Sequence, residues 1–258
     1  MTRFEEFTAL HRPGEPFLLP NAWDFGSGAL FAERGFPAVG TTSLGVAAAA
    51  GKPDAEGATE DETRDLARAL SRLPLPVTVD VEGGFGRSPE GVADYVSGLA
   101  DLGVAGVNLE DGAIGPEALR EIVAAVKARV PGVFVNARAD TYWLGRPDLE
   151  ETVRRCAEYA DAGADGLFVP GVADEAAIAE LVKRLDRPLN VLYGNGIGLA
   201  RLAELGVARV STGSYLYRVA VGAAVAAAAA IRAGEPAGDG EIPSYQDVTA
   251  LLPRGSQG

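Results

Sequence analysis

The sequence has few of the residues on which many enzymes rely for catalysis. Its 258 residues include one cysteine, Cys156, and one histidine, His11. A single cysteine cannot form a disulfide within the chain, which fits a reducing compartment, and we expect a cytoplasmic protein. One histidine, placed before the first predicted strand, argues against a histidine-based metal site or a Ser-His-Asp triad. The chemistry should therefore use carboxylates, arginine, hydroxyl groups, amides or a metal ion.

Positive charge and strongly hydrophobic runs are also scarce. The chain has 23 Lys and Arg against 36 Asp and Glu, a formal net charge of -13. This excess of negative charge repels phosphate backbones and anionic lipids, so we expect no nucleic-acid and no membrane partner. The most apolar late stretch, residues 219–234, is mostly alanine, which is too weakly hydrophobic to indicate a membrane span. It predicts instead a tightly packed helix.

Short strand-like runs alternate with helical stretches along the whole chain. The eight candidate strands are 17–20, 37–42, 76–82, 105–110, 133–138, 166–170, 188–193 and 208–212. Eight strands, each followed by a helix, predict a parallel sheet closed into a (β/α)₈ TIM barrel. An open doubly wound sheet is the alternative, but it needs a glycine-rich nucleotide loop after the first strand, which is missing.

The domain organisation follows from this pattern. We expect one domain over residues 1–258, with the barrel at about 17–233 and a C-terminal helical extension in the tail 234–258. No composition break or linker divides the body of the chain, and its length suits a single α/β barrel.

Three carboxylates end two neighbouring predicted strands, where catalytic side chains of such barrels lie. Asp80 and Glu82 are two residues apart, so both should face the same side of an extended strand, and Glu110 should join them. Unpaired carboxylates this close repel one another unless a cation or a proton intervenes. Ligation by oxygen alone favours Mg²⁺, with Mn²⁺ as a second possibility. The alternative interpretation is a solvated acidic rim.

Arg138 ends another strand that otherwise reads as buried. A guanidinium at the barrel mouth presents a planar fork to a carboxylate or a phosphate. An acidic protein needs such a group to accept a small anionic substrate. The alternative is an internal salt bridge from Arg138 to Asp140 or Glu110.

Several segments in this order match one enzyme superfamily. They are LPNAWD (19–24), TTSLGVAAAAGKPD (41–54), VDVEGGFG (79–86), GVNLED (106–111), NARAD (136–140) and FVPGV (168–172). From about Leu18 to Arg218 the chain resembles the isocitrate lyase/phosphoenolpyruvate mutase superfamily. The resemblance implies an enzyme that holds a pyruvate-like unit on Mg²⁺ and stabilises an enolate while a C–C or C–P bond breaks.

The resemblance also implies roles for individual residues. Asp80 matches the direct metal ligand, and Glu82, Glu110 and Asp54 match carboxylates that hold the waters of the metal. Asp54, Tyr193 or a metal-bound water could serve as the catalytic base beside Arg138. The residues expected to bind the substrate are Trp23, Thr42, Ser43, Leu44, Gly45, Arg138 and Asn190.

Two departures from the superfamily narrow the expected reaction. The segment 106–119 lacks the Lys, Cys and His of the lyase and mutase loops, and Gly171 replaces an expected glutamate. We therefore expect a Mg²⁺-dependent carbon–carbon lyase, like methylisocitrate lyase or oxaloacetate decarboxylase, acting on a small 2-hydroxy or 2-keto di- or tricarboxylic acid. The alternatives are C–P bond chemistry, as in phosphoenolpyruvate mutase or phosphonopyruvate hydrolase, and a non-catalytic barrel that binds a keto acid. The resemblance further implies a homo-oligomer, a dimer or tetramer that exchanges a C-terminal helix.

Overall fold

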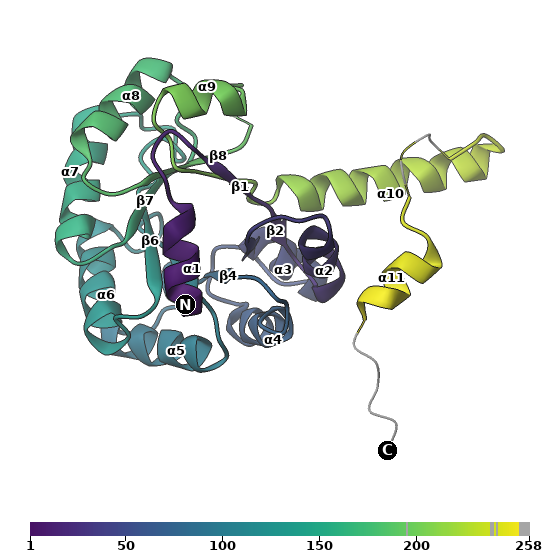
Figure 1. The fold of residues 1–258 in the computed structure, drawn as a ribbon, viewed down its shortest axis with the longest axis horizontal. Coiled ribbons are helices and arrows are strands. Elements are labelled where there is room, and N and C mark those ends of the chain that lie inside the picture. The colour runs from purple at the N-terminus through teal and green to yellow at the C-terminus, as the bar shows by residue number, and fades with distance from the viewer. Residues whose placement is uncertain (195, 238–239, 241, 253–258) are drawn as a thin grey trace.

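Parallel strands form a closed barrel surrounded by helices in the computed structural model of the protein (Figure 1). The structure describes residues 1–194, 196–237, 240 and 242–252, so part of the predicted tail 234–258 lies outside the described residues. The strands are β1 (Phe17–Leu19), β2 (Asn21–Ala22), β3 (Val39–Thr41), β4 (Val77–Asp80), β5 (Gly106–Glu110), β6 (Phe134–Arg138), β7 (Gly166–Val169), β8 (Leu189–Leu192) and β9 (Arg209–Ser211).

Helices follow most of these strands and cover the outside of the barrel (Figure 1). Several begin at side-chain caps that satisfy free backbone N–H groups, such as Asp24 before α2 and Ser88 before α5. The helices are α1 (Arg3–Leu10), α2 (Phe25–Glu33), α3 (Ser43–Ala50), α4 (Glu60–Leu70), α5 (Pro89–Asp101), α6 (Pro116–Arg129), α7 (Leu149–Asp161), α8 (Glu175–Arg184), α9 (Leu199–Glu204), α10 (Tyr215–Ala233) and α11 (Tyr245–Leu251).

The first strand is split into β1 and β2 by Pro20, which has no N–H to donate to a neighbouring strand. The segment β1 pairs with β9, and β2 pairs with β3, so the sheet closes on itself. The side-chain oxygen of Asn21 strengthens this closure by accepting hydrogen bonds from the backbone N–H groups of Thr212 and Gly213. The predicted (β/α)₈ barrel is confirmed.

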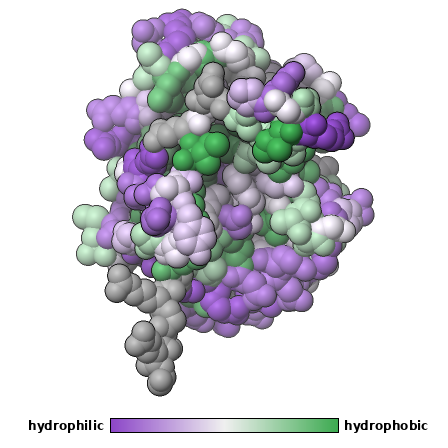
Figure 2. All heavy atoms as spheres, turned by 90° about the vertical axis from the view of Figure 1, so that its right-hand side faces the viewer, coloured by the Kyte–Doolittle hydropathy of each residue, from purple (hydrophilic) through white to green (hydrophobic). Residues whose placement is uncertain are grey.

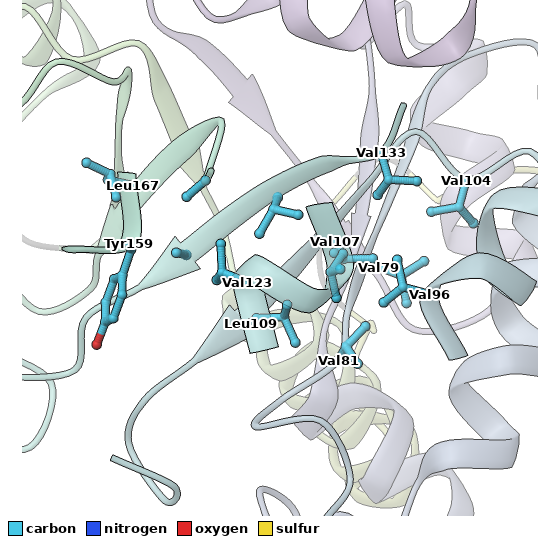
Figure 3. Close-up of a cluster of buried hydrophobic side chains, with 14 of the residues drawn as sticks. Val79, Val81, Val96, Val104, Val107, Leu109, Val123, Val133, Tyr159 and Leu167 are labelled. Atoms are coloured by element: carbon cyan, nitrogen blue, oxygen red, sulfur yellow. The ribbon is translucent and has the colours of Figure 1, made fainter. Parts of the chain in front are cut away.

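The hydrophobic core lies between the barrel and the helices around it. Val79 of β4 and Val107 of β5 are paired in register and belong to the same buried cluster as Val96 of α5 (Figure 3). Cys156 of α7 is fully buried in this cluster, as expected for a small apolar residue. Because strand side chains alternate, the neighbouring positions of β4 and β5 face the inside of the barrel.

The inside of the barrel is polar, and α1 packs against one end of it. Helix α1 begins with a capping box between Thr2 and Glu5 and buries Phe7 against Phe134. His11 follows the helix, and its ring stacks on Phe134 at 4.2 Å. Burial lowers the pKa of His11 to about 3, so the side chain is neutral at physiological pH. The single histidine is therefore part of the packing.

Helix α10 extends away from the barrel, and α11 lies back toward α2 (Figure 1). None of the 19 residues of α10 is buried, so the tight packing predicted for this helix is absent within one chain. Beyond its first turn, where Tyr215 and Tyr217 contact Tyr193 and Trp23, the valines and the isoleucine of α10 are exposed within the described part of the chain. Figure 2 shows the side of the molecule from which α10 projects, where hydrophobic and hydrophilic residues are mixed. Among the described helices, α10 alone has the length and apolar composition of a membrane span, which is weak support for a membrane location.

Candidate active site

A cavity of about 610 Å³ opens at the C-terminal ends of the strands. Residues from β2 to β9 and from the loops after them line it, as expected for a barrel enzyme. Seven of the predicted site residues contribute to its wall: Thr42, Ser43, Leu44, Asp54, Asp80, Glu110 and Arg138.

Asp80 is the last residue of β4, and its carboxylate is poorly satisfied. One oxygen, Oδ2, accepts a hydrogen bond from the backbone N–H of Ser43 at 3.3 Å, and Oδ1 accepts one from Glu82 N–H at 3.4 Å. Both bonds are long for a carboxylate. Burial raises the pKa of Asp80 above its ordinary value, against the opposing influence of Arg138. A cation near Asp80 would stabilise its charged form.

Asp54 lies in the loop between α3 and α4 and also lines the cavity. Its Oδ1 atom is buried and has no hydrogen-bond partner among the described residues. The negative charge of Asp54 helps to raise the pKa values of Asp80 and Glu82, so the three side chains lie close enough to interact. A buried carboxylate oxygen without a partner is costly, which indicates that a ligand completes this part of the site.

Glu82 is not part of the cavity wall, although the charge of Asp80 helps to raise its pKa, so the convergence of these carboxylates on one metal ion stays a prediction. Strand β4 ends at Asp80, and Glu82 has a left-handed backbone with φ of 52°, which breaks the alternation of side chains. Its carboxylate accepts hydrogen bonds from the N–H of Gly57 at 3.0 Å and the hydroxyl of Thr59 at 2.9 Å. Glu82 therefore anchors the loop that carries Asp54.

Glu110 and Asp140 both bind Arg138. The Nη1 atom of Arg138 lies 2.5 Å from Glu110 Oε2, and its Nε donates to Asp140 Oδ1 at 2.6 Å. Burial raises the pKa of Glu110 to about 8, although the charge of Arg138 acts in the opposite direction. The internal salt bridge considered as an alternative is thus present. Arg138 still lines the cavity, where its Nη2 group can donate to a ligand.

The arrangement of the carboxylates determines which metal site is feasible. Among the described residues, no group of three or more His, Cys, Asp and Glu side chains forms a ready-made metal cluster. Magnesium does not require one, because it usually keeps several waters and binds one or two protein carboxylates. The long bonds of Asp80 and the unpartnered oxygen of Asp54 fit such an ion. These two residues can hold Mg²⁺, or Mn²⁺, with water completing the coordination.

The other predicted substrate-binding and catalytic residues lie outside the wall of the cavity. Asn190 is buried inside the barrel, where its Oδ1 accepts a hydrogen bond from Ser211 at 3.1 Å. Trp23 packs against Tyr217 of α10 with ring centroids 5.5 Å apart, and Gly45 fits beside it. A Cβ atom at Gly45 would lie 2.8 Å from Trp23 Cβ, so this glycine permits close packing.

Tyr193, predicted as a possible base, is 48% exposed. Its ring packs against Tyr215 with centroids 4.9 Å apart, and it is not part of the cavity wall. Asp54 is thus the predicted base that the structure brings to the cavity.

Several residues of the wall were missed from the sequence, and four of them bear on ligand binding. Trp143 and Phe168 form an apolar side near Arg138, whose guanidinium carbon lies 5.5 Å and 5.7 Å from their ring centroids. Asn108 faces the cavity from β5, and Arg218 reaches it from the start of α10. Arg218 forms no ion pair within the described part of the chain. Of these residues, Asn108 could have been identified from the sequence, because it is a polar residue within an otherwise apolar predicted strand.

Comparison with known proteins gives one family and several relatives. The phosphoenolpyruvate phosphomutase family matches residues 7–232. An uncharacterized protein of Mycobacterium tuberculosis is 46% identical over 234 residues, which cover 89% of this chain and 90% of that protein. The 2-methylisocitrate lyase of Salmonella typhimurium is 33% identical over 194 residues, covering 64% of this chain and 65% of the lyase.

Solved structures show the same fold. A crystal structure from Burkholderia cenocepacia J2315, provisionally described as a lyase/mutase, superposes with a TM-score of 0.86 and 36% identity over 96% of this chain and 94% of that one. Phosphonopyruvate hydrolase, crystallised with oxalate and Mg²⁺, superposes with a TM-score of 0.83 over 97% of this chain and 95% of that one. At 23% identity the second likeness concerns the fold alone.

Proposed function

The chain belongs to the phosphoenolpyruvate phosphomutase family, and from that premise we propose that it is a Mg²⁺-dependent carbon–carbon lyase. The substrate class is a small 2-keto or 2-hydroxy di- or tricarboxylic acid. One observation carries the proposal: the same cavity is lined by the under-satisfied carboxylates of Asp54 and Asp80 and by an arginine that two other carboxylates already hold in place. The relative named 2-methylisocitrate lyase supports this class of reaction.

The protein side of the substrate site has two anion-binding features. Arg138 offers its Nη2 group to the carboxylate next to the keto carbon. Helix α3 begins at the same cavity, and its cap residue Thr42 makes no side-chain cap bond. The N–H of Ser43 donates to Asp80, so the N–H groups that follow it in the first turn are the ones open to an anion. Leu44 on this first turn lines the cavity, which supports binding of the second carboxylate of the substrate there.

Asp80 and Asp54 would hold the metal in the same cavity. When bound, Mg²⁺ supplies Lewis-acid stabilisation of the negative charge that develops on the keto oxygen. For a 2-keto substrate, the electron pair of the breaking C–C bond passes toward the keto carbonyl, the leaving fragment departs as carbon dioxide or an aldehyde or keto acid, and water returns a proton to the enolate carbon. For a 2-hydroxy substrate, Asp54 accepts the hydroxyl proton, and the hydroxyl-bearing carbon becomes the carbonyl of one product. The electron pair of the C–C bond then passes to the carbon next to a carboxylate of the other product, which takes up a proton. The apolar side formed by Trp143 and Phe168 limits the access of water to the developing charge.

A panel of acids tests this function. The protein is incubated with Mg²⁺ and oxaloacetate, 2-methylisocitrate or phosphonopyruvate, and the release of pyruvate and of phosphate is measured, with EDTA as the metal-free control. Metal-dependent pyruvate release without phosphate supports a carbon–carbon lyase. Phosphate release from phosphonopyruvate would contradict the carbon–carbon lyase and indicate C–P bond chemistry. Tight oxalate binding without any turnover would indicate a keto-acid-binding protein.

We also propose that α10 is covered by a second copy of the chain. The helix exposes Val219, Val221, Val225 and Ile231, an apolar surface that is unusual for a helix standing in water. Light scattering after gel filtration should give a mass of a dimer or tetramer. A monomer of 26.6 kDa would contradict the proposal.

A further inference from the structure

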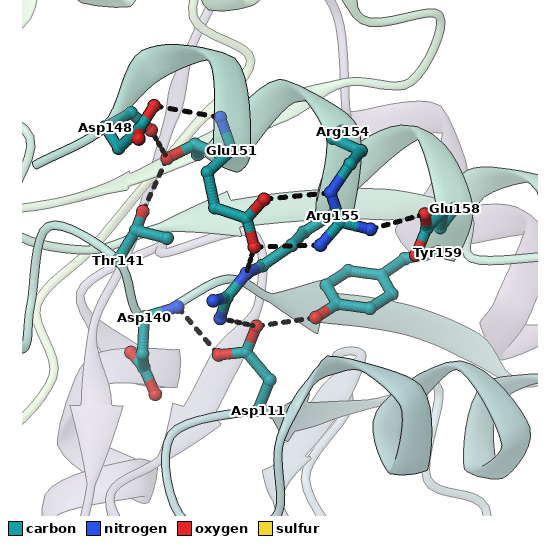
Figure 4. Close-up of polar contacts among 10 residues, drawn as sticks. Asp111, Asp140, Thr141, Asp148, Glu151, Arg154, Arg155, Glu158 and Tyr159 are labelled. Atoms are coloured by element: carbon teal, nitrogen blue, oxygen red, sulfur yellow. Dashed lines mark hydrogen bonds and ion pairs between the residues drawn. The ribbon is translucent and has the colours of Figure 1, made fainter.

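A second polar network is centred on Asp111 and is linked to Asp140, one of the two carboxylates that bind Arg138 (Figure 4). We propose that Asp111, held by Tyr159 and Arg155 of α7, is a positioning residue that fixes the guanidinium of Arg138 for the substrate. This inference rests on the proposed function, because it concerns how the same site holds an anion. None of these three residues lies at the reacting atoms.

Asp111 follows directly after β5, and its side chain is fully buried. Its backbone N–H donates to the carbonyl of Arg138 at 3.2 Å. Its Oδ1 accepts a hydrogen bond from the backbone N–H of Asp140 at 2.9 Å. Asp111 thus binds the backbone of both Arg138, the last residue of β6, and Asp140, two residues later. These two bonds fix the backbone from which the side chains of Arg138 and Asp140 extend.

The second carboxylate oxygen of Asp111 is bound from α7. Tyr159 donates its hydroxyl to Oδ2 at 2.5 Å, and Arg155 Nη1 donates to the same atom at 3.0 Å. Arg155 is itself held by Glu151 at 2.7 Å. A buried carboxylate is stable only when its charge and lone pairs are satisfied, and α7 provides both a cation and a phenol. Figure 4 shows both side chains pointing at Asp111.

The network reaches Arg138 through the side chain of Asp140. Its Oδ1 accepts the 2.6 Å bond from Arg138 Nε. Its Oδ2 packs against Gly112, where an added Cβ atom would lie only 2.5 Å away. Asp140 is therefore confined by the bond from its own backbone to Asp111 and by the absence of a side chain at Gly112. Movement of Asp140 would rotate the guanidinium plane that the substrate must meet.

Two variants disturb this network without touching the cavity carboxylates of β4. Tyr159→Phe removes one hydroxyl outside the cavity wall, whereas Gly112→Ala pushes on Asp140 and, because Gly112 lines the cavity, also adds a methyl group to the wall, so Tyr159→Phe is the cleaner of the two. Tyr95→Phe is the matched control, because Tyr95 is also a buried tyrosine whose hydroxyl donates to a backbone carbonyl, that of Glu60, at 3.0 Å. It lies on α5, outside the network.

Calorimetry with Mg²⁺ and oxalate measures the effect on anion binding. We expect oxalate affinity to fall roughly tenfold in Tyr159→Phe and Gly112→Ala, and the KM for a turned-over acid to rise similarly with kcat nearly unchanged. Mg²⁺ binding alone should stay as in the wild type, which separates misplacement of Arg138 from general damage. Tyr95→Phe should bind oxalate within about twofold of the wild type. Unchanged oxalate affinity in both network variants would overturn the proposal.

A ligand-free measurement keeps the inference testable if the wild type binds no Mg²⁺-oxalate and the proposed function fails. The unfolding equilibrium constants of Tyr159→Phe, Arg138→Met and the double variant form a double-mutant cycle. Coupling on the order of threefold or more between two side chains that do not touch supports a connected network. Strict additivity would show that Tyr159 does not act on Arg138.

Discussion

The two walls of the cavity differ in how well their charges are satisfied. On the β6 wall, Arg138 has carboxylate partners at 2.5 Å and 2.6 Å, and Asp111 in the neighbouring network binds Arg155 at 3.0 Å. On the β4 wall, Asp80 accepts only backbone bonds of 3.3 Å and 3.4 Å, and one oxygen of Asp54 has no partner in the described chain. The charges of the β6 wall are thus balanced within the protein, and Arg138 is held ready to bind an anion. The carboxylates of the β4 wall, in contrast, need a bound cation to balance them.

The largest effect should come from the β4 wall. We expect Asp80→Ala to lower metal-dependent turnover on the order of 10³-fold, because it removes the carboxylate that would hold the metal. Without Mg²⁺, its free energy of unfolding should be equal to or higher than that of the wild type, since a poorly bonded buried carboxylate is lost. Turnover assays and urea unfolding check the two parts. Normal turnover at saturating Mg²⁺ would remove Asp80 from the metal site.

On the β6 wall, a change of Arg138 should lower the free energy of unfolding, in contrast to the change of Asp80 on the β4 wall. Arg138→Lys keeps the charge but cannot bind Glu110, Asp140 and a substrate at once. We expect kcat/KM to fall roughly 10²-fold, mainly through KM, and the free energy of unfolding to drop by about 1–3 kcal/mol. Steady-state kinetics and urea unfolding measure both. A near-normal KM would show that Arg138 is only structural and would remove the difference between the walls.

The smallest effect is a dependence of stability on pH in the absence of metal. Glu110, whose pKa rises from 4.5 to about 8, keeps its proton in the folded state at pH values where the unfolded chain has lost it. Stability should therefore fall as pH rises through this window, by up to about 1.4 kcal/mol per pH unit for one group. His11 is neutral in the folded state, whereas in the unfolded chain, where its pKa is 6.5, it still holds part of its proton at pH 6.5; it therefore adds a smaller slope of opposite sign that fades toward pH 8.

Urea unfolding at pH 6.5, 7 and 8 measures this slope, and Glu110→Gln is the control that should reduce it. Mg²⁺ stabilises ionised carboxylates, so saturating Mg²⁺ should flatten the slope of the wild type. Metal-free stability that rises over this range would contradict the assigned protonation of the site.

The barrel was predictable because its signals are local. The predicted strand 133–138 is found at Phe134–Arg138, and the predicted strand 105–110 at Gly106–Glu110, since apolar runs bounded by turn residues define both. The division of the first strand at Pro20 follows from pairing with two different neighbours, which local patterns do not show. Helix α1 was missed, although Thr2 followed three residues later by Glu5 is a recognised start signal.

The site was predictable only in part, because its geometry depends on contacts between distant residues. The end of each strand could be located, and this placed Asp80, Glu110 and Arg138 at the cavity. The left-handed backbone of Glu82 could not be foreseen for a residue without special preference for it. The network centred on Asp111 joins it to Tyr159 across 48 residues of sequence, and no periodic pattern connects them.

The closure of the barrel has a consequence for how the protein is made. Asn21 is bound to Thr212 and Gly213, 191 and 192 residues later in the chain. During synthesis, β1 emerges early and keeps an unpaired edge until β9 has left the ribosome. Chains that stop before residue 209 should expose this edge and self-associate, so a cell needs the complete barrel, or a chaperone, to keep the nascent protein from aggregating.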